Sequence, residues 1–145
     1  MNEKLNKLLS KIKFKVLPQD FLIINIPLNQ YEKFSKNFKK IKNNFYSLIL
    51  EKEGISLIIS NKNWDKIKSN FNMYKVETGY KILTYNTNTD LNLVGFLSII
   101  SKILASKRIS LNVISAYHRD YFLIKKSKVK LAIKELNKFI KNYKK

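Results

Sequence analysis

The triplet His118-Arg119-Asp120 is the stretch of this sequence whose letters match a catalytic motif. The same residue types open the catalytic loop of protein kinases, where the aspartate accepts the substrate hydroxyl proton. A kinase also needs a Gly-rich loop over the nucleotide phosphates and a later Asp-Phe-Gly, and this chain of three glycines contains neither. Tyr121 and Lys125 stand where the kinase loop has a leucine and a metal-binding asparagine. The triplet therefore does not indicate kinase chemistry.

The sequence contains few residues suited to other catalytic or metal-binding chemistries. The chain has no cysteine, which excludes disulfides, a thiolate nucleophile and thiolate zinc sites, and its one histidine cannot supply a histidine pair. The sequence offers no acid–base or nucleophile pair at a useful spacing. We therefore expect a protein that is not an enzyme and that has no cofactor and no metal.

A net charge of +19 is typical of a nucleic-acid-binding protein. Only Arg108 and Arg119 among the 29 basic residues are arginine, the residue favoured for base and phosphate recognition. A joint excess of lysine, asparagine and isoleucine is what an AT-rich coding bias produces. In residues 125–145, apolar residues at helical spacing leave most lysines on the opposite, solvated face. A lysine-rich nucleic-acid-binding protein on an α+β scaffold remains the alternative function.

The length of 145 residues and the 45% hydrophobic content suit one domain or two small packed units. The opening residues 1–17 alternate lysine with leucine and isoleucine and lack the continuous apolar region of a secretory signal. No apolar run approaches the roughly 18 residues that a bilayer span requires. We expect a soluble cytoplasmic protein with no membrane contact.

Apolar periodicity in the first half predicts strands, a helix, two strands and a short amphipathic segment. The first two strands flank a turn at Pro18-Gln19-Asp20, and the second two flank Lys52-Glu53-Gly54. The predicted strands are 13–17, 21–26, 45–51 and 55–60, the predicted helix is 30–41 with Tyr31, Phe34, Phe38 and Ile41 inward, and the short segment surrounds Trp64 and Ile67.

The second half repeats the same order of elements. It contains strands at 80–86, 110–116 and 121–125, a helix at 93–107, and a terminal helix from residue 128, with Gly79 expected to form a turn before the first strand. The helix at 93–107 is expected to turn Phe96, Leu97, Ile100, Ile103 and Leu104 inward. We therefore predict an α+β protein of two βαββα units, 1–72 and 73–145, each with an antiparallel sheet covered by helices.

The His-Arg-Asp triplet falls between the strands at 110–116 and 121–125 in this arrangement. It therefore lies at the tip of a hairpin, where side chains are mostly solvated. His118 is expected to be an exposed turn residue without a chemical role.

Several residues of this region occur together at a characteristic spacing: Asp90, Gly95, Ile109-Ser110, Ser115-Ala116-Tyr117 and Asp120-Tyr121. Through them residues 90–124 resemble the ACT domain, and in particular the ACT-like unit of the CASTOR arginine sensors and their small prokaryotic relatives. Ala116 and Arg119 depart from this pattern, which has threonine at both positions.

The resemblance implies ferredoxin-like units and a regulatory protein that binds a small molecule, most simply an amino acid, without catalysis. Backbone amides of a helix beginning near residue 92 suit a ligand carboxylate, and an aspartate at the hairpin suits an ammonium or guanidinium group. The implied ligand-binding residues are Asp90, Leu91, Asn92, Leu93, Val94, Gly95, Ile114, Ser115 and Asp120.

Purely structural roles for these residues stay open. Asp90 or Asn92 can cap the helix, Gly95 can allow close helix–sheet packing, and Asp120 can close a turn. A free-standing unit of this kind would act as a homodimer, which closes exposed strand edges, or through a partner enzyme or regulator.

Overall fold

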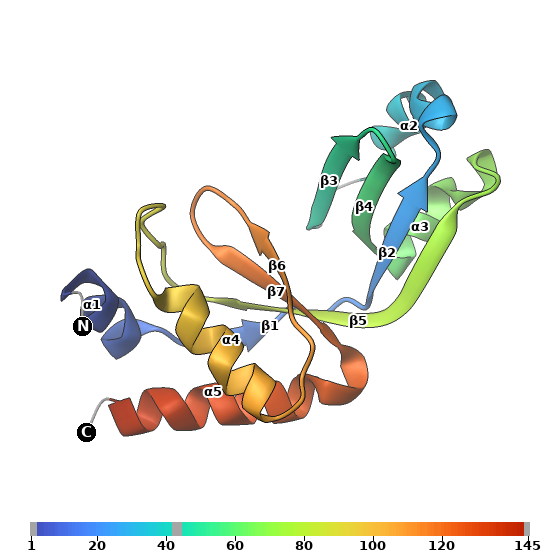
Figure 1. Cartoon of the computed structure of the whole chain (residues 1–145). Coiled ribbons are helices and arrows are strands. Elements are labelled where there is room, and N and C mark those ends of the chain that lie inside the picture. The colour runs from blue at the N-terminus through green and yellow to red at the C-terminus, as the bar shows by residue number, and fades with distance from the viewer. Residues whose placement is uncertain (1–2, 42–44, 144–145) are drawn as a thin grey trace. The chain divides into compact units, whose positions relative to one another are not determined.

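The computed structural model describes residues 3–41 and 45–143 and divides the chain into two compact units (Figure 1). Unit 1 combines the residues up to Pro18 with those from Lys81 onward, and unit 2 is Gln19–Tyr80. The sequence predicted units at 1–72 and 73–145, so the structure assigns the N-terminal segment to the C-terminal unit. The reason is a long-range pairing of residues 14–16 with residues 83–85, which local patterns cannot show.

Unit 2 contains a four-stranded antiparallel sheet in the order β3-β4-β2-β5. Its elements are β2 (Phe21–Ile26), the 3-10 helix η1 (Leu28–Gln30), α2 (Tyr31–Phe38), β3 (Tyr46–Glu51), β4 (Gly54–Ser60), α3 (Asn61–Ile67), the 3-10 helix η2 (Lys68–Asn70) and the first part of β5 (Lys75–Tyr85).

Alternating apolar residues give this sheet its buried face. Leu22, Ile24 and Ile26 of β2 and the matching positions of β4 pack in one cluster with Phe34 of α2 and Trp64 of α3. Period-two alternation in the strands and one apolar stripe in each helix therefore produce a two-layer unit, as the sequence predicted. Tyr31 departs from the prediction, because it is 46% exposed rather than inward.

Gly79 lies inside β5 and does not form a turn before it. The register between β2 and β5 shifts near this residue, because Phe21 pairs with Tyr80 whereas Ile23 pairs with Glu77. Gly79 takes φ +78° at this bulge. The strand predicted at 80–86 therefore begins earlier, at Lys75, and the glycine supplies the positive φ of a β-bulge.

Unit 1 contains a sheet in the order β1-β5-β7-β6, packed with three helices. Its elements are α1 (Glu3–Lys11), β1 (Phe14–Val16), the second part of β5, α4 (Phe96–Ser106), β6 (Asn112–Ser115), β7 (Asp120–Lys125), the 3-10 helix η3 (Lys126–Lys128) and α5 (Val129–Tyr143).

The short strand β1 completes the sheet of unit 1. It pairs antiparallel with β5, from Phe14 opposite Tyr85 to Val16 opposite Leu83. In the sheet of unit 2, the strand at the equivalent edge, next to β2, is the first part of β5. The strands predicted at 13–17 and 21–26 are thus confirmed, but they do not form a hairpin, because each pairs with β5.

Helix α1 was not among the predicted elements. Its Leu5, Leu8 and Leu9 are buried in the core of unit 1, and Ile12 continues the same face. This i, i+3, i+4 spacing, with lysines on the opposite face, is the pattern of an amphipathic helix and is present in the sequence. The helix covers apolar surface that the βαββα elements of unit 1 would otherwise expose.

The predicted α+β class, with antiparallel sheets covered by helices, is confirmed. The terminal helix is also confirmed: Val129, Ala132 and Leu136 are buried, and lysines occupy its exposed side. Within residues 3–41 and 45–143, no helix combines the length and apolar character needed to cross a membrane.

The glycines of unit 2 provide a test of this backbone geometry. Gly54 has φ +136°, and an added Cβ would lie 2.6 Å from the backbone oxygen of Ile26, whereas a Cβ on Gly79 would meet nothing within 4 Å. Gly54→Ala should therefore lower the free energy of unfolding by more than about 2 kcal/mol. Gly79→Ala should lower the free energy of unfolding by only about 1 kcal/mol, because the positive φ is the only source of strain there. Urea denaturation of both variants measures the difference, and equal losses would contradict the close approach of Gly54 to β2.

Candidate functional site

The β6–β7 hairpin places the His-Arg-Asp triplet at its turn, as predicted. Ser115 pairs with Asp120 in the last rung, and the amide of Ala116 donates to the carbonyl of Arg119 at 3.1 Å. The His118 side chain is exposed. The hairpin therefore separates the triplet, with His118 at the tip and Asp120 at the base.

The Asp120 carboxylate is held by two hydroxyl groups. The Ser115 hydroxyl donates to Oδ1 at 2.7 Å, and the Tyr85 hydroxyl donates to Oδ2 at 3.4 Å. No lysine or arginine among the described residues forms an ion pair with this carboxylate. The Asp120 carboxylate is thus oriented by neutral donors and has no cationic partner among the described residues.

Tyr85 fixes the position of Asp120 from the end of β5. Its ring is fully buried and contacts the ring of Phe96 edge to face. Its hydroxyl accepts from the Asp120 amide at 2.9 Å and lies 3.1 Å from the Thr89 hydroxyl. Burial raises the pKa of the Tyr85 hydroxyl, so this group stays protonated and neutral at physiological pH.

Arg119 joins the hairpin turn to the loop that follows β5. Its guanidinium donates to the carbonyl of Tyr85 at 3.1 Å and to Asn88 Oδ1 at 2.9 Å. The carbonyl of His118 accepts from the amide of Thr89 at 2.8 Å. Arg119 is therefore engaged by the loop and leaves the neighbouring Asp120 without a charge partner.

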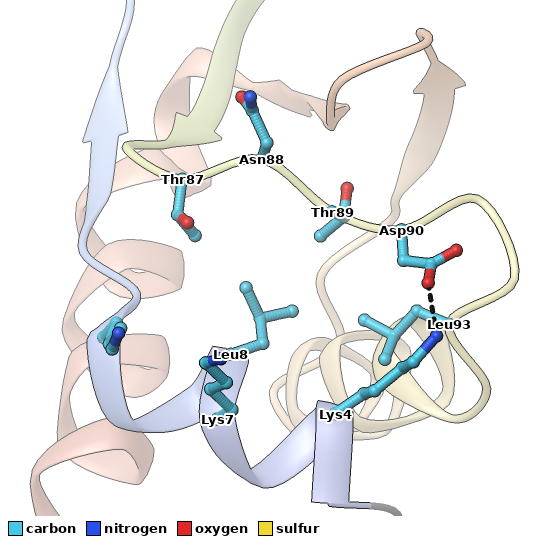
Figure 2. Close-up of a pocket in the computed structure, with 9 residues that line it drawn as sticks. Lys4, Lys7, Leu8, Thr87, Asn88, Thr89, Asp90 and Leu93 are labelled. Atoms are coloured by element: carbon cyan, nitrogen blue, oxygen red, sulfur yellow. Dashed lines mark hydrogen bonds and ion pairs between the residues drawn. The ribbon is translucent and has the colours of Figure 1, made fainter.

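Asp90 anchors the other end of that loop. Its Oδ1 accepts from the amide of Asn92 at 2.9 Å, and its Oδ2 accepts from Lys4 Nζ of α1 at 2.6 Å (Figure 2). The hydrogen bond from Lys4, the Asn92 amide and the Lys4 charge hold the pKa of the Asp90 carboxyl below its ordinary 3.8. The same hydrogen bond and the carboxylate charge raise the pKa of Lys4 above 10.5. The pair therefore stays ionised across the physiological range.

Helix α4 begins later than the sequence predicted. The predicted start was residue 93, but Gly95 is the N-cap with φ +94°, and the first helical residue is Phe96. Residues 90–93 form a separate turn, in which the Asn92 amide donates to Asp90 Oδ1, and therefore lie outside the helix. A Cβ on Gly95 would lie 3.3 Å from a methyl group of Leu5, so this glycine also allows close packing against α1. The first-turn amides of α4 remain without helical partners.

These elements enclose a pocket of about 180 Å³, which we name the Asp120 pocket. Its walls are the loop before α4, the first residues of α4, and the hairpin base. It is lined by Thr89, Asp90, Leu91, Leu93, Phe96, Leu97, Ser115, Ala116 and Asp120.

Only some of the predicted site residues line this pocket. The structure brings Asp90, Leu91, Leu93, Ser115 and Asp120 to its wall. Asn92, Val94, Gly95 and Ile114 do not line it. Leu97, expected in the core, is 40% exposed and lines the pocket instead. Thr89 and Tyr85 were missed, although both lie within five residues of Asp90 in the sequence.

No three His, Cys, Asp or Glu side chains gather as a metal site in the part of the chain that the structure describes. The Asp120 pocket presents one carboxylate that bonds to hydroxyl groups and one that is paired with a lysine.

The family model of the ACT domain matches residues 75–138. These residues run from the start of β5 into α5 and include every residue that lines the Asp120 pocket. The resemblance inferred from residues 90–124 is therefore confirmed as an ACT domain, while the narrower likeness to the CASTOR-type sensors stays a prediction. No curated protein sequence matches the chain.

Solved structures with the same fold cover most of the chain. A protein of unknown function from Vibrio cholerae has a TM-score of 0.69 at 20% identity, over 95% of this chain and 97% of its own. Aspartate kinase from Clostridium acetobutylicum has a TM-score of 0.68 at 14% identity, over 90% of this chain and 34% of that enzyme. The regulatory subunit of aspartate kinase from Thermus thermophilus has a TM-score of 0.62 at 9% identity, over 86% and 95%. At these identities the likeness shows the shared fold.

The Lys4–Asp90 ion pair predicts a pH-dependent stability. The Asp90 contribution is fully present above pH 3.8 and is lost as the pH falls through its lowered folded pKa. The Lys4 contribution is present below pH 10.5 and is lost as the pH rises through its raised folded pKa. Asp90→Asn should therefore lower the midpoint of thermal unfolding throughout this window, and the difference from the native protein should shrink at its acid and alkaline ends.

Asp65→Asn is the matched control, because the Asp65–Lys68 pair has the same 2.6 Å separation but joins residues three apart. Circular dichroism melts over a pH series measure both variants, and Asp65→Asn should cause the smaller loss. A difference for Asp90→Asn that does not change with pH would contradict an electrostatic role for this pair.

Proposed function

We propose that this chain is a regulatory protein whose Asp120 pocket binds an α-amino acid. The observation that carries this proposal is the Asp120 carboxylate, which is oriented by the hydroxyl groups of Ser115 and Tyr85 and lacks a cation among the described residues. A ligand ammonium or guanidinium group would donate a charge-assisted hydrogen bond to this carboxylate. An acid group of the ligand would be bound at the opposite wall.

The opposite wall is the beginning of α4. Phe96 and Leu97, its first two residues, line the pocket. The amides of a first helical turn have no helical partners and carry positive dipole character, which favours a carboxylate. The pocket thus offers groups suited to both charged ends of an amino acid.

The size of the pocket favours a small ligand. Its volume of about 180 Å³ corresponds to roughly six water molecules at their share of liquid volume. Pockets for drug-sized ligands are larger, roughly 300–1,000 Å³. This volume favours a ligand of the size of a free amino acid over a nucleotide.

Regulation rather than catalysis is the activity that the comparisons support. The ACT domain match covers the pocket, and the structures of similar fold include a regulatory subunit of aspartate kinase. No histidine, lysine or cysteine is among the described residues that line the pocket. The ligand would act by changing how the protein pairs with itself or with a partner enzyme or regulator.

The lysine content alone does not favour nucleic-acid binding over this proposal. Lys130, Lys134 and Lys138 are exposed on α5, opposite its buried residues, as expected of a solvated helix face. The two functions differ in salt dependence, because phosphate-backbone binding falls steeply with salt and pocket binding does not. A thermal-shift screen of the amino acids at two salt concentrations therefore separates them.

The decisive variants are Asp120→Asn and His118→Ala. Asp120→Asn keeps the shape of the side chain and its hydroxyl neighbours but removes the charge. It should weaken binding of the amino acid found by the screen by about 2 to 3 kcal/mol, a factor of roughly 30 to 150. His118→Ala removes an exposed side chain and should cost less than about 0.5 kcal/mol. Titration calorimetry measures both. Equal losses, or no loss at Asp120, would overturn the proposed site.

Edge strand β3 provides the surface through which we propose that the protein pairs with a second copy. Leu48, Ile49 and Leu50 are 37%, 56% and 51% exposed on this strand, which lies at the end of the unit 2 sheet. Leu48 and Leu50 also line an apolar hollow with Phe34 and Phe38 of α2. An exposed apolar strand edge is commonly covered by symmetric pairing.

Light scattering should therefore give a mass of twice 17.1 kDa for the native chain. The double variant Leu48→Lys and Leu50→Lys should shift this mass to that of a monomer, because it places charges in the paired surface. Met73→Lys is the control at a residue that is 89% exposed and distant in sequence from β3. A native monomer at all accessible concentrations, with and without amino acids, would contradict the proposal.

A further inference from the structure

A second pocket of about 250 Å³ lies between α1 and the loop that follows β5 (Figure 2). One wall is formed by Lys4, Lys7 and Lys11, whose spacing places them along one side of α1. The remaining lining residues are Leu8, Thr87, Asn88, Thr89, Asp90 and Leu93. This second pocket, which we name the Lys7 pocket, shares Thr89, Asp90 and Leu93 with the Asp120 pocket.

The Lys7 pocket carries uncompensated positive charge. Lys4 is paired with Asp90, the one acidic residue of the lining. The ammonium groups of Lys7 and Lys11 have no hydrogen-bond or ion-pair partner among the described residues. Three lysines facing one carboxylate leave a net charge of +2 around the pocket.

The loop wall opposite these lysines is held in place from both ends. The Asn86 amide donates to the carbonyl of Lys13 at 3.2 Å, and Asn86 Oδ1 accepts from the Lys13 amide at 2.8 Å. Asn88 and Thr89 are bonded to Arg119 and to the His118 carbonyl. These hydrogen bonds connect the loop wall to the segment that follows α1 and to the β6–β7 hairpin.

Thr87 adds a neutral polar group to this wall. Figure 2 shows its side chain pointing toward α1, whereas Asn88 points away. The Thr87 hydroxyl has no hydrogen-bond partner within the described residues. Leu8 and Leu93 separate the polar groups with apolar surface. A ligand in this pocket would meet two ammonium groups, one hydroxyl group and an apolar contact.

We infer that the Lys7 pocket is a binding site for a phosphate group, either free or on a small organic phosphate. Lysine binds phosphate as a point charge, and a threonine hydroxyl can donate to a phosphate oxygen. A phosphate monoester carries a charge of about −1.5 to −2 at neutral pH, which matches the +2 of the pocket. A single carboxylate would leave half of that charge uncompensated. This inference does not depend on amino-acid binding in the Asp120 pocket.

Titration calorimetry in a phosphate-free buffer of low ionic strength tests the site, with inorganic phosphate and glycerol 3-phosphate as probes. Saturable binding of one phosphate per chain is expected, with a dissociation constant on the order of 1 mM or lower. The variant Lys7→Gln with Lys11→Gln should weaken binding by at least about tenfold, and Thr87→Val by a smaller factor. Tighter binding of the ester would indicate an organic phosphate as the ligand, and tighter binding of inorganic phosphate would indicate the free ion.

The matched control is Lys130→Gln with Lys134→Gln, two exposed lysines of α5 at the same four-residue spacing. This variant removes the same charge outside any lysine pocket and should change the affinity by less than about twofold. Asp120→Asn should also leave phosphate binding unchanged, which distinguishes this site from the amino-acid pocket. Circular dichroism confirms that each variant is folded.

Three results would overturn the inference. The first is no saturable binding of either probe up to about 10 mM. The second is an equal loss of phosphate affinity in the Lys7/Lys11 variant and the Lys130/Lys134 variant, which would mean diffuse attraction to a basic surface. The third is binding of a single-stranded RNA oligonucleotide that excludes both small phosphates and weakens equally in the two pairs, which would mean that the lysines serve a polyanion.

Discussion

The buried hydroxyl group of Tyr85 is the interaction on which the site depends. It accepts a hydrogen bond from the backbone of Asp120, contacts the carboxylate of the same residue and lies beside Thr89. A buried polar group must be hydrogen-bonded, so this one hydroxyl fixes the relative positions of the central strand, the hairpin base and the loop before α4. The Asp120 pocket is lined by residues of the hairpin base and of the loop that this hydroxyl joins.

The N-terminal segment completes the unit that carries the site. Strand β1 pairs with β5, and α1 buries its leucines in the same core as α4 and α5. Lys4 then reaches Asp90, so the beginning of the chain is tied to the loop that lines both pockets. Asp90 is common to the Asp120 pocket and the Lys7 pocket.

Local sequence patterns predicted most of the elements and the hairpin that carries Asp120. They could not predict pairings between distant residues, such as β1 with β5 or Lys4 with Asp90, because no local periodicity encodes them. The start of α4 was misplaced for a different reason. Residues 90–93 form a turn of their own, and Gly95 adopts the positive φ that begins the helix.

The electrostatics of the site were likewise predicted only in part. A role for Asp120 was inferred from its spacing and from the family resemblance, but its freedom from Arg119 was not. That freedom depends on the acceptors Asn88 and the Tyr85 carbonyl, which draw the guanidinium toward the loop. Which of two adjacent opposite charges remains available is a property of the tertiary structure.

The central claim is that an amino acid binds between Asp120 and the first turn of α4. Titration of isotopically labelled protein with the amino acid that the thermal screen identifies, followed by backbone amide NMR, tests this claim most directly. Saturable shifts are predicted at Phe96, Leu97, Ser115 and Asp120, with smaller changes on β3 and α2. Saturable shifts confined to β3 and α2, or none at the Asp120 pocket, would contradict the claim.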